Sequence, residues 1–271
     1  MEKHNLVVRI SNYAAMLLLA ILPFTSKGQT PFIPKNISFQ EGEKLTFKVY
    51  YNMSFIWINS GTAEFTIKDE NINNHKAYHI TGVGKTASSF EWFYKVVDTY
   101  ESYIDKETML PLKFLRHVNE GGMKIENDVT FNHAKEQAIS DKKAYAIPPG
   151  TQDVLSAMYF ARNINYNNYK VGDKISFSMF LDNQVYNLYV KYLGKERITT
   201  KMGTFNAVKI VPLLIKGTIF KGGEKMTIWL SDDNNHLPVR VESPILIGSV
   251  KIDLLDYQNL RNPLSGLVSR D

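Results

Sequence analysis

The side chains of this sequence that could do chemistry do not form a complete catalytic set. His79 to Thr86 read H-I-T-G-V-G-K-T and end like the phosphate-binding loop G-x-x-x-x-G-K-T. His79 stands where that loop needs its first glycine, which lets the backbone turn tightly and aim its N–H groups at phosphate. The segment therefore predicts a strand rather than a nucleotide site.

A serine–lysine pair is equally weak as a sign of nucleophilic catalysis. Ser140 and Lys143 have a suitable spacing, but they lie in a charged, turn-like stretch. A nucleophile needs a base that is held in a dry and fixed site. The sequence also lacks G-x-S-x-G. We interpret this stretch as a solvated turn and predict no catalytic residues.

Metal ligands are also not concentrated in any one segment. After the N-terminal segment the histidines are scattered, and none belongs to H-E-x-x-H; they are His75, His79, His117, His133 and His236. A zinc site needs three or four convergent ligands. Asp232 to Asn235 lack the spaced carboxylates and final glutamate of a calcium loop, so we expect a polar hairpin tip. We predict no metal and no cofactor.

Four carboxylates lie close together in the sequence, at Glu91, Asp98, Glu101 and Asp105. Glycoside hydrolysis needs two carboxyl groups at a set separation across a cleft. The sequence cannot establish such a pair. A glycan-acting hydrolase of the cell envelope is therefore retained only as an alternative function.

Aromatic clusters are the strongest remaining candidates for a binding site. Phe55 and Trp57 lie at an expected turn, and Trp92 and Phe93 lie between two strands. Core packing is one interpretation, and the lip of an apolar groove is the other. Periplasmic carriers hold acyl chains between a curved sheet and a helix, which is an analogy of fold alone. Arg162 and Arg240 could meet an anionic head group there, although we favour pairing with nearby acids.

The elements that must position these residues are mainly strands. Apolar residues alternate in segments 44–50, 63–67, 175–179 and 226–230, and turn residues separate them every 8–15 residues. This pattern favours an antiparallel β fold, as a curved sheet, open barrel or sandwich.

One segment, at 151–163, predicts a helix that covers the open side of the sheet. Thr151 could cap it, with Asp153 in the first turn, where the helix dipole favours a carboxylate. Apolar residues then follow at helical spacing.

The chain also repeats itself. Glu41–Phe47 resembles Val171–Phe177, and two later matches, 77–80 with 207–210 and 105–114 with 232–241, follow in the same order. We predict two related β units, 29–145 and 169–260, joined by a helical connection at 146–168. Pro263, Ser265 and Gly266 suggest that the tail 261–271 is unordered.

The first 28 residues read as a secretory signal. Lys3 and Arg9 precede an apolar run of about 12 residues, which is shorter than the ~20 that span a bilayer. Small residues then lead to an expected cut after Gly28. Removing Lys3, Arg9, Lys27 and Glu2 from the whole-chain totals of 32 basic and 27 acidic residues leaves a net charge of +3. That interspersed charge predicts no nucleic-acid partner.

The composition points to the periplasm or outer-membrane periphery of a Gram-negative bacterium. The chain has no cysteine, which excludes disulfides and a lipid-modified cysteine. We therefore expect an exported chain that is not a lipoprotein and has no transmembrane segment after cleavage.

Several segments together resemble a family of exported bacterial proteins that is known only as a domain of unknown function. They are GEKLTFKVYY with GTAEF, DVLSAMYFAR, VGDKISF, GTFNAVKI and WLSDDNNHLPVRVE. The resemblance covers roughly residues 38–258. It implies a periplasmic or outer-membrane-associated β-rich protein and supplies no catalytic residues.

These observations favour an exported, non-enzymatic binding protein. It would bind either an apolar or amphipathic ligand or a partner protein. The possible partners are a lipid, a glycan and another envelope protein. The alternatives are the glycan-acting hydrolase and a structural or assembly factor, which would expose an apolar patch without a pocket.

Overall fold

The computed structural model divides the chain into two units, Met1–Thr30 and Pro31–Asp271. The residues that it describes are 33–53, 56–92, 95–120, 122–216, 222–245 and 247–270, all in the second unit. The expected signal segment, 1–28, lies outside the described residues.

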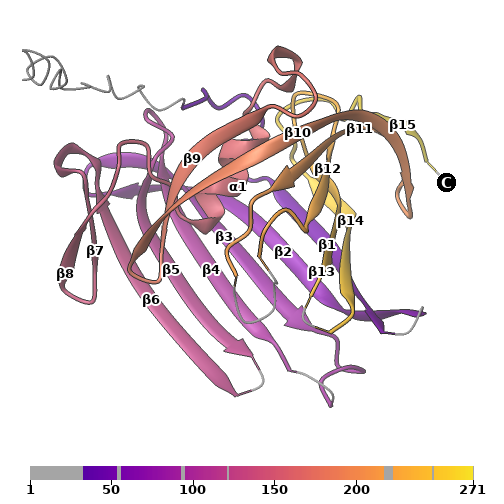
Figure 1. Cartoon of the computed structure of the whole chain (residues 1–271), viewed down its shortest axis with the longest axis horizontal. Helices are drawn as coiled ribbons and strands as arrows, with labels where there is room; N and C mark the ends of the chain where they lie inside the picture. Colours follow the sequence, from indigo (N-terminus) through magenta and orange to yellow (C-terminus); the bar gives the residue numbers. More distant parts are fainter. Residues whose placement is uncertain are drawn as a thin grey trace, which may run out of the picture. The chain divides into compact units, whose positions relative to one another are not determined.

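A single antiparallel sheet of fifteen strands dominates the second unit (Figure 1). The strands before the helix are β1 Lys44–Met53, β2 Ile56–Ile72, β3 His75–Thr86, β4 Val97–Asp105, β5 Pro111–Glu120, β6 Met123–Asn132, β7 Gln137–Ser140 and β8 Lys143–Ala146. The strands after it are β9 Lys174–Leu181, β10 Gln184–Thr200, β11 Gly203–Pro212, β12 Thr227–Ser231, β13 Pro238–Pro244, β14 Ser249–Gln258 and β15 Leu267–Ser269. This confirms the predicted mainly β, curved and unclosed antiparallel fold.

The order of strands in the sheet follows the sequence, with one junction between its two halves. It runs β8-β7-β6-β5-β4-β3-β2-β1-β14-β13-β12-β11-β10-β9, and β15 pairs with β11. Each half is a meander of neighbouring hairpins, because short connections keep consecutive antiparallel strands adjacent. The two halves join where β1 pairs with β14, for example Tyr50 with Lys251.

Helix α1, Val154–Arg162, lies against the sheet between its two halves (Figure 1). Leu155 and Tyr159 pack in a cluster with residues of β2 and β3, and Phe160 packs in another with Ile175 of β9. Burial of each large apolar side chain contributes about 1.5–3 kcal/mol. The two short 3₁₀ helices are η1 His133–Lys135 and η2 Tyr166–Asn168.

The helix begins differently from the prediction. Asp153 is itself the N-cap, and its carboxylate accepts a hydrogen bond from the backbone N–H of Ser156. In return, the backbone N–H of Asp153 donates a hydrogen bond to the Ser156 hydroxyl, which completes a capping box. Thr151, predicted as the cap, instead donates its hydroxyl to the carbonyl of Pro148. The capping box prevails because it satisfies two backbone groups at once.

The two halves have corresponding strands in the same order. Strands β1 to β6 correspond to β9 to β14, and the second strand of each set, β2 and β10, has 17 residues. The division into two related β units stays a prediction.

The tail is ordered where the structure describes it, so the expectation of an unordered tail is wrong. Asn235 and Asn262 exchange hydrogen bonds, and Leu267–Ser269 form β15. Turn-forming residues here allow the chain to bend back, and the polar groups of the β12–β13 loop then hold it.

Candidate functional site

The six predicted ligand-binding residues do not gather at one place. Phe55 and Phe93 lie outside the described residues. Trp57 and Trp92 lie at the end of the sheet where β1 joins β2 and β3 joins β4. Arg162 ends helix α1, and Arg240 lies on β13.

Exposed apolar side chains cluster at that end of the sheet. We call this set the apolar rim, and its described members are Ile56, Trp57, Ile58, Trp92 and Ile247. Trp92 is 83% exposed, Ile247 70% and Ile56 67%. Single exposed apolar residues are ordinary, whereas exposed apolar residues gathered at neighbouring hairpin tips form a candidate binding surface.

Tyr51, at the end of β1, contacts the two neighbouring hairpin tips of the apolar rim. Its hydroxyl donates to the carbonyl of Ile247, 3.2 Å away, and its ring lies 5.9 Å from that of Phe90 in the β3–β4 loop. The indole N–H of Trp92 donates to the carbonyl of Ser89 at 3.1 Å. The polar edge of the indole is therefore satisfied by the protein while the ring stays exposed.

Beside the apolar rim lies a group of lysines that sequence reasoning did not single out. We call Lys48, Lys201 and Lys251 the lysine cluster, because their ammonium groups lie 6.0, 5.3 and 5.3 Å from the centroid of the Tyr50 ring. The Lys251 ammonium also lies 4.5 Å from the Trp57 ring. The lysine cluster and the apolar rim therefore meet at Lys251.

Strand register explains why these residues converge. Tyr50 lies opposite Lys251 in the β1–β14 pair, and opposed residues share a face of the sheet. Lys48 is two residues before Tyr50, so it points to the same side. Lys201 comes from the β10–β11 turn. Only the period-two spacing of Lys48 and Tyr50 was visible in the sequence, and it does not identify the other strands.

Arg240 lies on the same face as the lysine cluster and pairs with an acid. Its guanidinium donates to both oxygens of Asp253, at 2.6 and 2.8 Å, and this hydrogen bonding raises the pKa of Arg240. Asp253 also lies opposite Lys48 in the sheet. The arginine thus has a fixed partner, whereas the three lysines have no ion-pair partner among the described residues.

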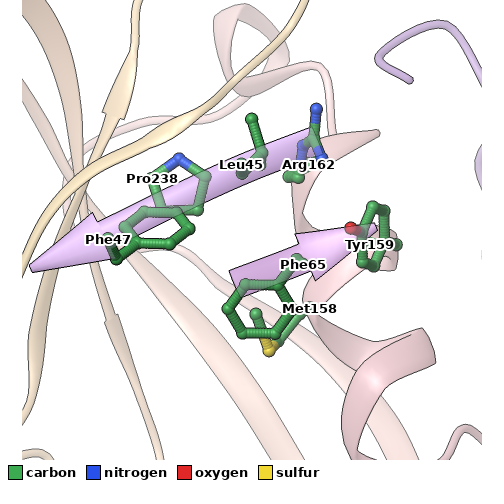
Figure 2. Close-up of a pocket in the computed structure, with 7 residues that line it drawn as sticks. All are labelled: Leu45, Phe47, Phe65, Met158, Tyr159, Arg162 and Pro238. Atoms are coloured by element: carbon green, nitrogen blue, oxygen red, sulfur yellow. The ribbon is translucent and has the colours of Figure 1, made fainter. Parts of the chain in front are cut away.

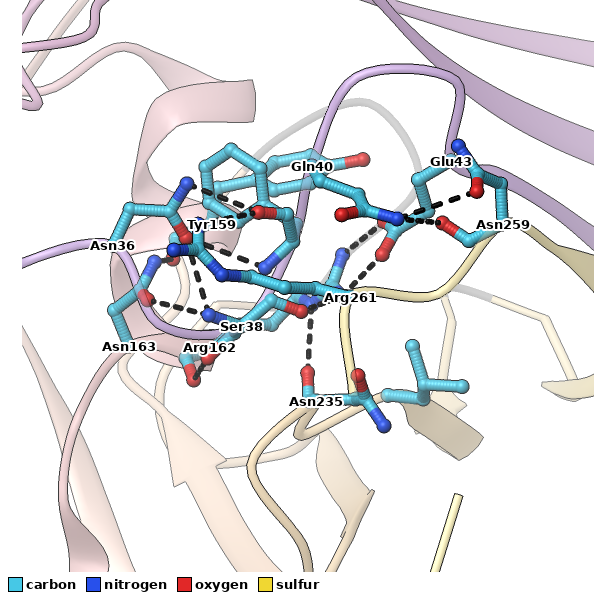
Figure 3. A network of polar contacts seen from close by, with 12 residues as sticks. Asn36, Ser38, Gln40, Glu43, Tyr159, Arg162, Asn163, Asn235, Asn259 and Arg261 are labelled. Atoms are coloured by element: carbon cyan, nitrogen blue, oxygen red, sulfur yellow. Dashed lines mark hydrogen bonds and ion pairs between the residues drawn. The ribbon is translucent and has the colours of Figure 1, made fainter. Parts of the chain in front are cut away.

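Arg162 belongs to a buried polar network (Figure 3). Its side chain is 3% exposed and forms a two-pronged ion pair with Glu43, at 2.6 and 2.9 Å. It also donates to the carbonyls of Ser38 and Asn235. Burial alone would lower the pKa of Arg162, but the Glu43 carboxylate outweighs it and raises that pKa. The network attaches the irregular segment before β1 and the β12–β13 loop to α1.

The space between α1 and the sheet is closely filled at this point. Figure 2 shows a crevice lined by seven residues, Leu45, Phe47, Phe65, Met158, Tyr159, Arg162 and Pro238. Its volume is about 10 Å³, which is room for roughly one water molecule. The crevice is too small for an acyl chain.

A second hollow, of about 300 Å³, is polar and borders the Asp232–Asn235 loop. Its carboxylates already have partners. Asp232 pairs with Lys195 at 2.8 Å, and Asp233 accepts from Ser231, Asn235 and Gly266. These bonds shape the hairpin tip that the sequence predicts.

The histidines and clustered carboxylates lie in separate local contacts. His75 contacts Asp105, and His79 lies between Glu70 and Glu101 at 3.1 and 2.7 Å. Asp98 accepts from the backbone N–H of Asn119. The other histidines contact Glu126, the Pro111 carbonyl and the Arg162 carbonyl; they are His117, His133 and His236.

The two sequence patterns that resemble catalytic loops are ordinary β structure. The segment resembling a phosphate loop is part of β3, and Ser140 ends β7 before a tight turn at Asp141 and Lys142. Within the described part of the chain, no cluster of three acidic, histidine or cysteine side chains could hold a metal ion. The same residues include no helix with the length and apolarity to cross a bilayer.

The fold is similar to those of known bacterial proteins. A β-barrel-like protein of the domain of unknown function DUF1849 from Brucella abortus matches with a TM-score of 0.51 at 11% identity, covering 85% of this chain and 99% of that one. This similarity establishes the fold alone.

Two further solved structures are less similar. A proposed lipoprotein from Parabacteroides distasonis has a TM-score of 0.37 at 14% identity and covers 84% of this chain and 100% of its own. A proposed exported protein with a YmcC-like fold from Bacteroides fragilis has a TM-score of 0.32 at 12% identity, covering 83% and 100%. No curated protein is significantly similar in sequence.

The family comparison agrees with the resemblance of the strand and helix segments. The model of a protein family of unknown function matches residues 46–255, most of the second unit and both halves of its sheet. This chain therefore belongs to the DUF3108 family of proteins of unknown function.

Proposed function

We propose that this chain is an exported cell-envelope protein that binds an amphipathic lipid and catalyses no reaction. The N-terminal segment has the charge, apolar run and small residues of a secretory signal, which supports export. The periplasm or outer-membrane periphery of a Gram-negative bacterium is the compartment that fits a cysteine-free exported chain.

The observation that carries the binding proposal is the apolar rim. Its side chains come from three neighbouring hairpin tips, around β1–β2, β3–β4 and β13–β14, and stay exposed although the protein has a well-formed core. Transfer of a fully exposed side chain of this size to an apolar phase yields about 1.5–3 kcal/mol. Because the rim side chains are only partly exposed, an acyl chain lying on these tips would gain a part of that energy from each one that it covers.

The experiment is native mass spectrometry of residues 29–271 purified from a bacterial periplasm, followed by solvent extraction. We expect a co-purifying lipid mass that denaturation releases. The variant Trp92→Ser/Ile247→Ser should lose it. The matched control Val171→Ser/Leu255→Ser also changes two exposed apolar residues, but away from the rim. An apo wild-type protein, or equal lipid in the rim variant, would contradict the proposal.

A structural or assembly factor is the second candidate function. The crevice beside α1 holds about one water, so the apolar rim is an exposed surface and not the mouth of that crevice. Cross-linking from the rim in living cells tests this candidate. Capture of one defined envelope protein, together with an apo mass, would favour assembly over lipid binding.

A further inference from the structure

We infer that the lysine cluster and the Tyr50 hydroxyl bind the phosphate or carboxylate head group of an anionic amphiphile. This inference rests on the proposed function for the apolar part of the ligand, which would lie on the apolar rim. The anionic part has its own evidence in the charges and hydrogen-bonding groups around Tyr50.

The first argument is the convergence of uncompensated positive charge. The ammonium groups of Lys48, Lys201 and Lys251 all lie within 6.0 Å of one ring centroid. Like charges held this close repel one another, and a bound anion would remove that repulsion.

Lysines elsewhere on the sheet contrast with this cluster. Several have acidic partners within 3.1 Å: Lys44 with Glu64, Lys113 with Asp128, and Lys191 with Glu224. Within the described ranges, none of the three clustered lysines has such a partner. Three lysines from separate elements are therefore available to an anion.

The second argument is the unused hydroxyl of Tyr50. This residue is only 7% exposed, yet its hydroxyl forms no hydrogen bond with the residues that the structure describes. The hydroxyl oxygen is also not among the described polar atoms that are sealed from solvent without a partner. It therefore reaches the surface, where it can donate to a bound oxyanion.

The nearby acids do not cancel the cluster. Asp253 accepts hydrogen bonds from two nitrogen atoms of the Arg240 guanidinium, and Glu242 lies 3.9 Å from the same guanidinium. Among the described residues, the group made of these two acids, Arg240 and the lysine cluster holds four cations and two carboxylates. The net charge stays positive, so a singly or doubly charged head group is electrostatically favoured.

The third argument is the position of the cluster beside the apolar rim. The Lys251 ammonium lies 5.3 Å from the centroid of the Tyr50 ring and 4.5 Å from the centroid of the Trp57 ring. A head group at Tyr50 would therefore place an attached chain beside Trp57, the start of the apolar rim. This adjacency favours an amphiphile over a free anion.

The test measures affinities of residues 29–271 for three probes by isothermal titration calorimetry below the micelle concentration. The probes are dodecyl phosphate, uncharged dodecyl maltoside and inorganic phosphate. We expect dodecyl phosphate to bind most tightly, and its affinity to fall as salt rises.

The variant K48Q/K201Q/K251Q should lose about tenfold or more in affinity for dodecyl phosphate and keep its affinity for dodecyl maltoside. Its matched control is K76Q/K135Q/K170Q, which neutralises three exposed lysines without ion pairs elsewhere. The single variant K201Q changes a residue in an exposed turn, so it replaces the triple variant if that protein fails to fold. Tyr50→Phe tests the role of the hydroxyl.

The outcomes separate the two proposals. Unchanged dodecyl phosphate affinity in both the triple variant and K201Q would overturn the head-group site. Inorganic phosphate that binds as tightly as dodecyl phosphate would retain an anion site and reject the amphiphile. Trp92→Ser/Ile247→Ser should weaken both dodecyl probes and leave inorganic phosphate unaffected. If that variant binds both normally, the proposed function fails while the lysine site stands.

Discussion

Asp153 is the N-cap of α1 and is fully buried. These two features together determine the pKa of its carboxyl group. Its carboxylate accepts hydrogen bonds from the Ser102 hydroxyl at 2.6 Å and the Ser156 backbone N–H at 2.8 Å. Burial raises the pKa of Asp153 to about 6, although these hydrogen bonds oppose the rise. The carboxyl group therefore binds its proton more strongly in the folded state than in the unfolded chain.

This shift predicts a pH dependence of stability. Between the unfolded pKa near 3.8 and the folded pKa of about 6, the native state holds more protons, so its stability falls as pH rises. The contribution lost by pH 7 is about 3 kcal/mol. Asp153→Asn stays neutral and remains a good N-cap, so it should lack this part of the decline.

The measurement for Asp153 is urea unfolding of both proteins at pH 4, 5, 6 and 7. The difference between wild type and Asp153→Asn should grow across this range. Asp128→Asn, which removes an exposed carboxylate, controls for the loss of one charge. Parallel curves for wild type and Asp153→Asn would show that Asp153 does not titrate in this window.

At the scale of elements, packing explains the glycines of the segment that resembles a phosphate loop. A Cβ added to Gly82 would lie 2.8 Å from the Phe65 ring and 3.6 Å from Leu155 of α1. A Cβ at Gly84, in the same strand, would meet nothing within 4 Å. Gly82 therefore allows Phe65 and α1 to lie close to β3.

These surroundings predict different effects of the same substitution within β3. Gly82→Ala should destabilise the protein by about 1–3 kcal/mol, because Phe65 must shift from its packed position. Gly84→Ala should be neutral or stabilising by up to about 1 kcal/mol, because alanine has less freedom to lose on folding. Urea unfolding at one pH compares them. Equal losses would mean that contact with Phe65 and α1 is not the reason for glycine.

At the scale of the whole second unit, the two halves of the sheet depend on one another. Helix α1 packs against both, with Leu155 and Tyr159 toward one set of strands and Phe160 toward the other. The β1–β14 pair joins them edge to edge, and Glu43 before β1 binds Arg162 at the end of α1. Each half alone would expose a sheet edge and a large apolar face.

Separation of the halves should therefore abolish folding. We expect residues 29–145 and residues 169–271, expressed alone, to lack the dispersed amide NMR spectrum of the intact protein. The intact chain cut by a protease site placed in the exposed turn at 170–173 serves as the control, because it keeps both halves and α1. A dispersed spectrum from either half alone would mean that it is an independent domain.

The sequence by itself determined the fold class and the main features of its organisation. Alternating apolar residues, such as Leu45, Phe47 and Val49, are a local pattern, and a strand with one buried face requires it. The helix at 151–163 was equally visible because its apolar residues recur with helical spacing. Local spacing gave no unique assignment of the cap, where Asp153 rather than Thr151 completes reciprocal bonds with Ser156.

Only the tertiary structure decided which functional candidates lie together. Arg162 pairs with Glu43, which is 119 residues away in the sequence, so no local pattern predicts the burial of Arg162. Trp57 and Trp92 were visible as aromatic residues, but strand pairing places both at one end of the sheet beside Ile247. Lys48, Lys201 and Lys251 meet at Tyr50 through β-sheet register and a distant turn. The alternation of side chains can be recognised within the sequence of a single strand. Which strands pair with it, and in which register, depends on how the whole chain packs.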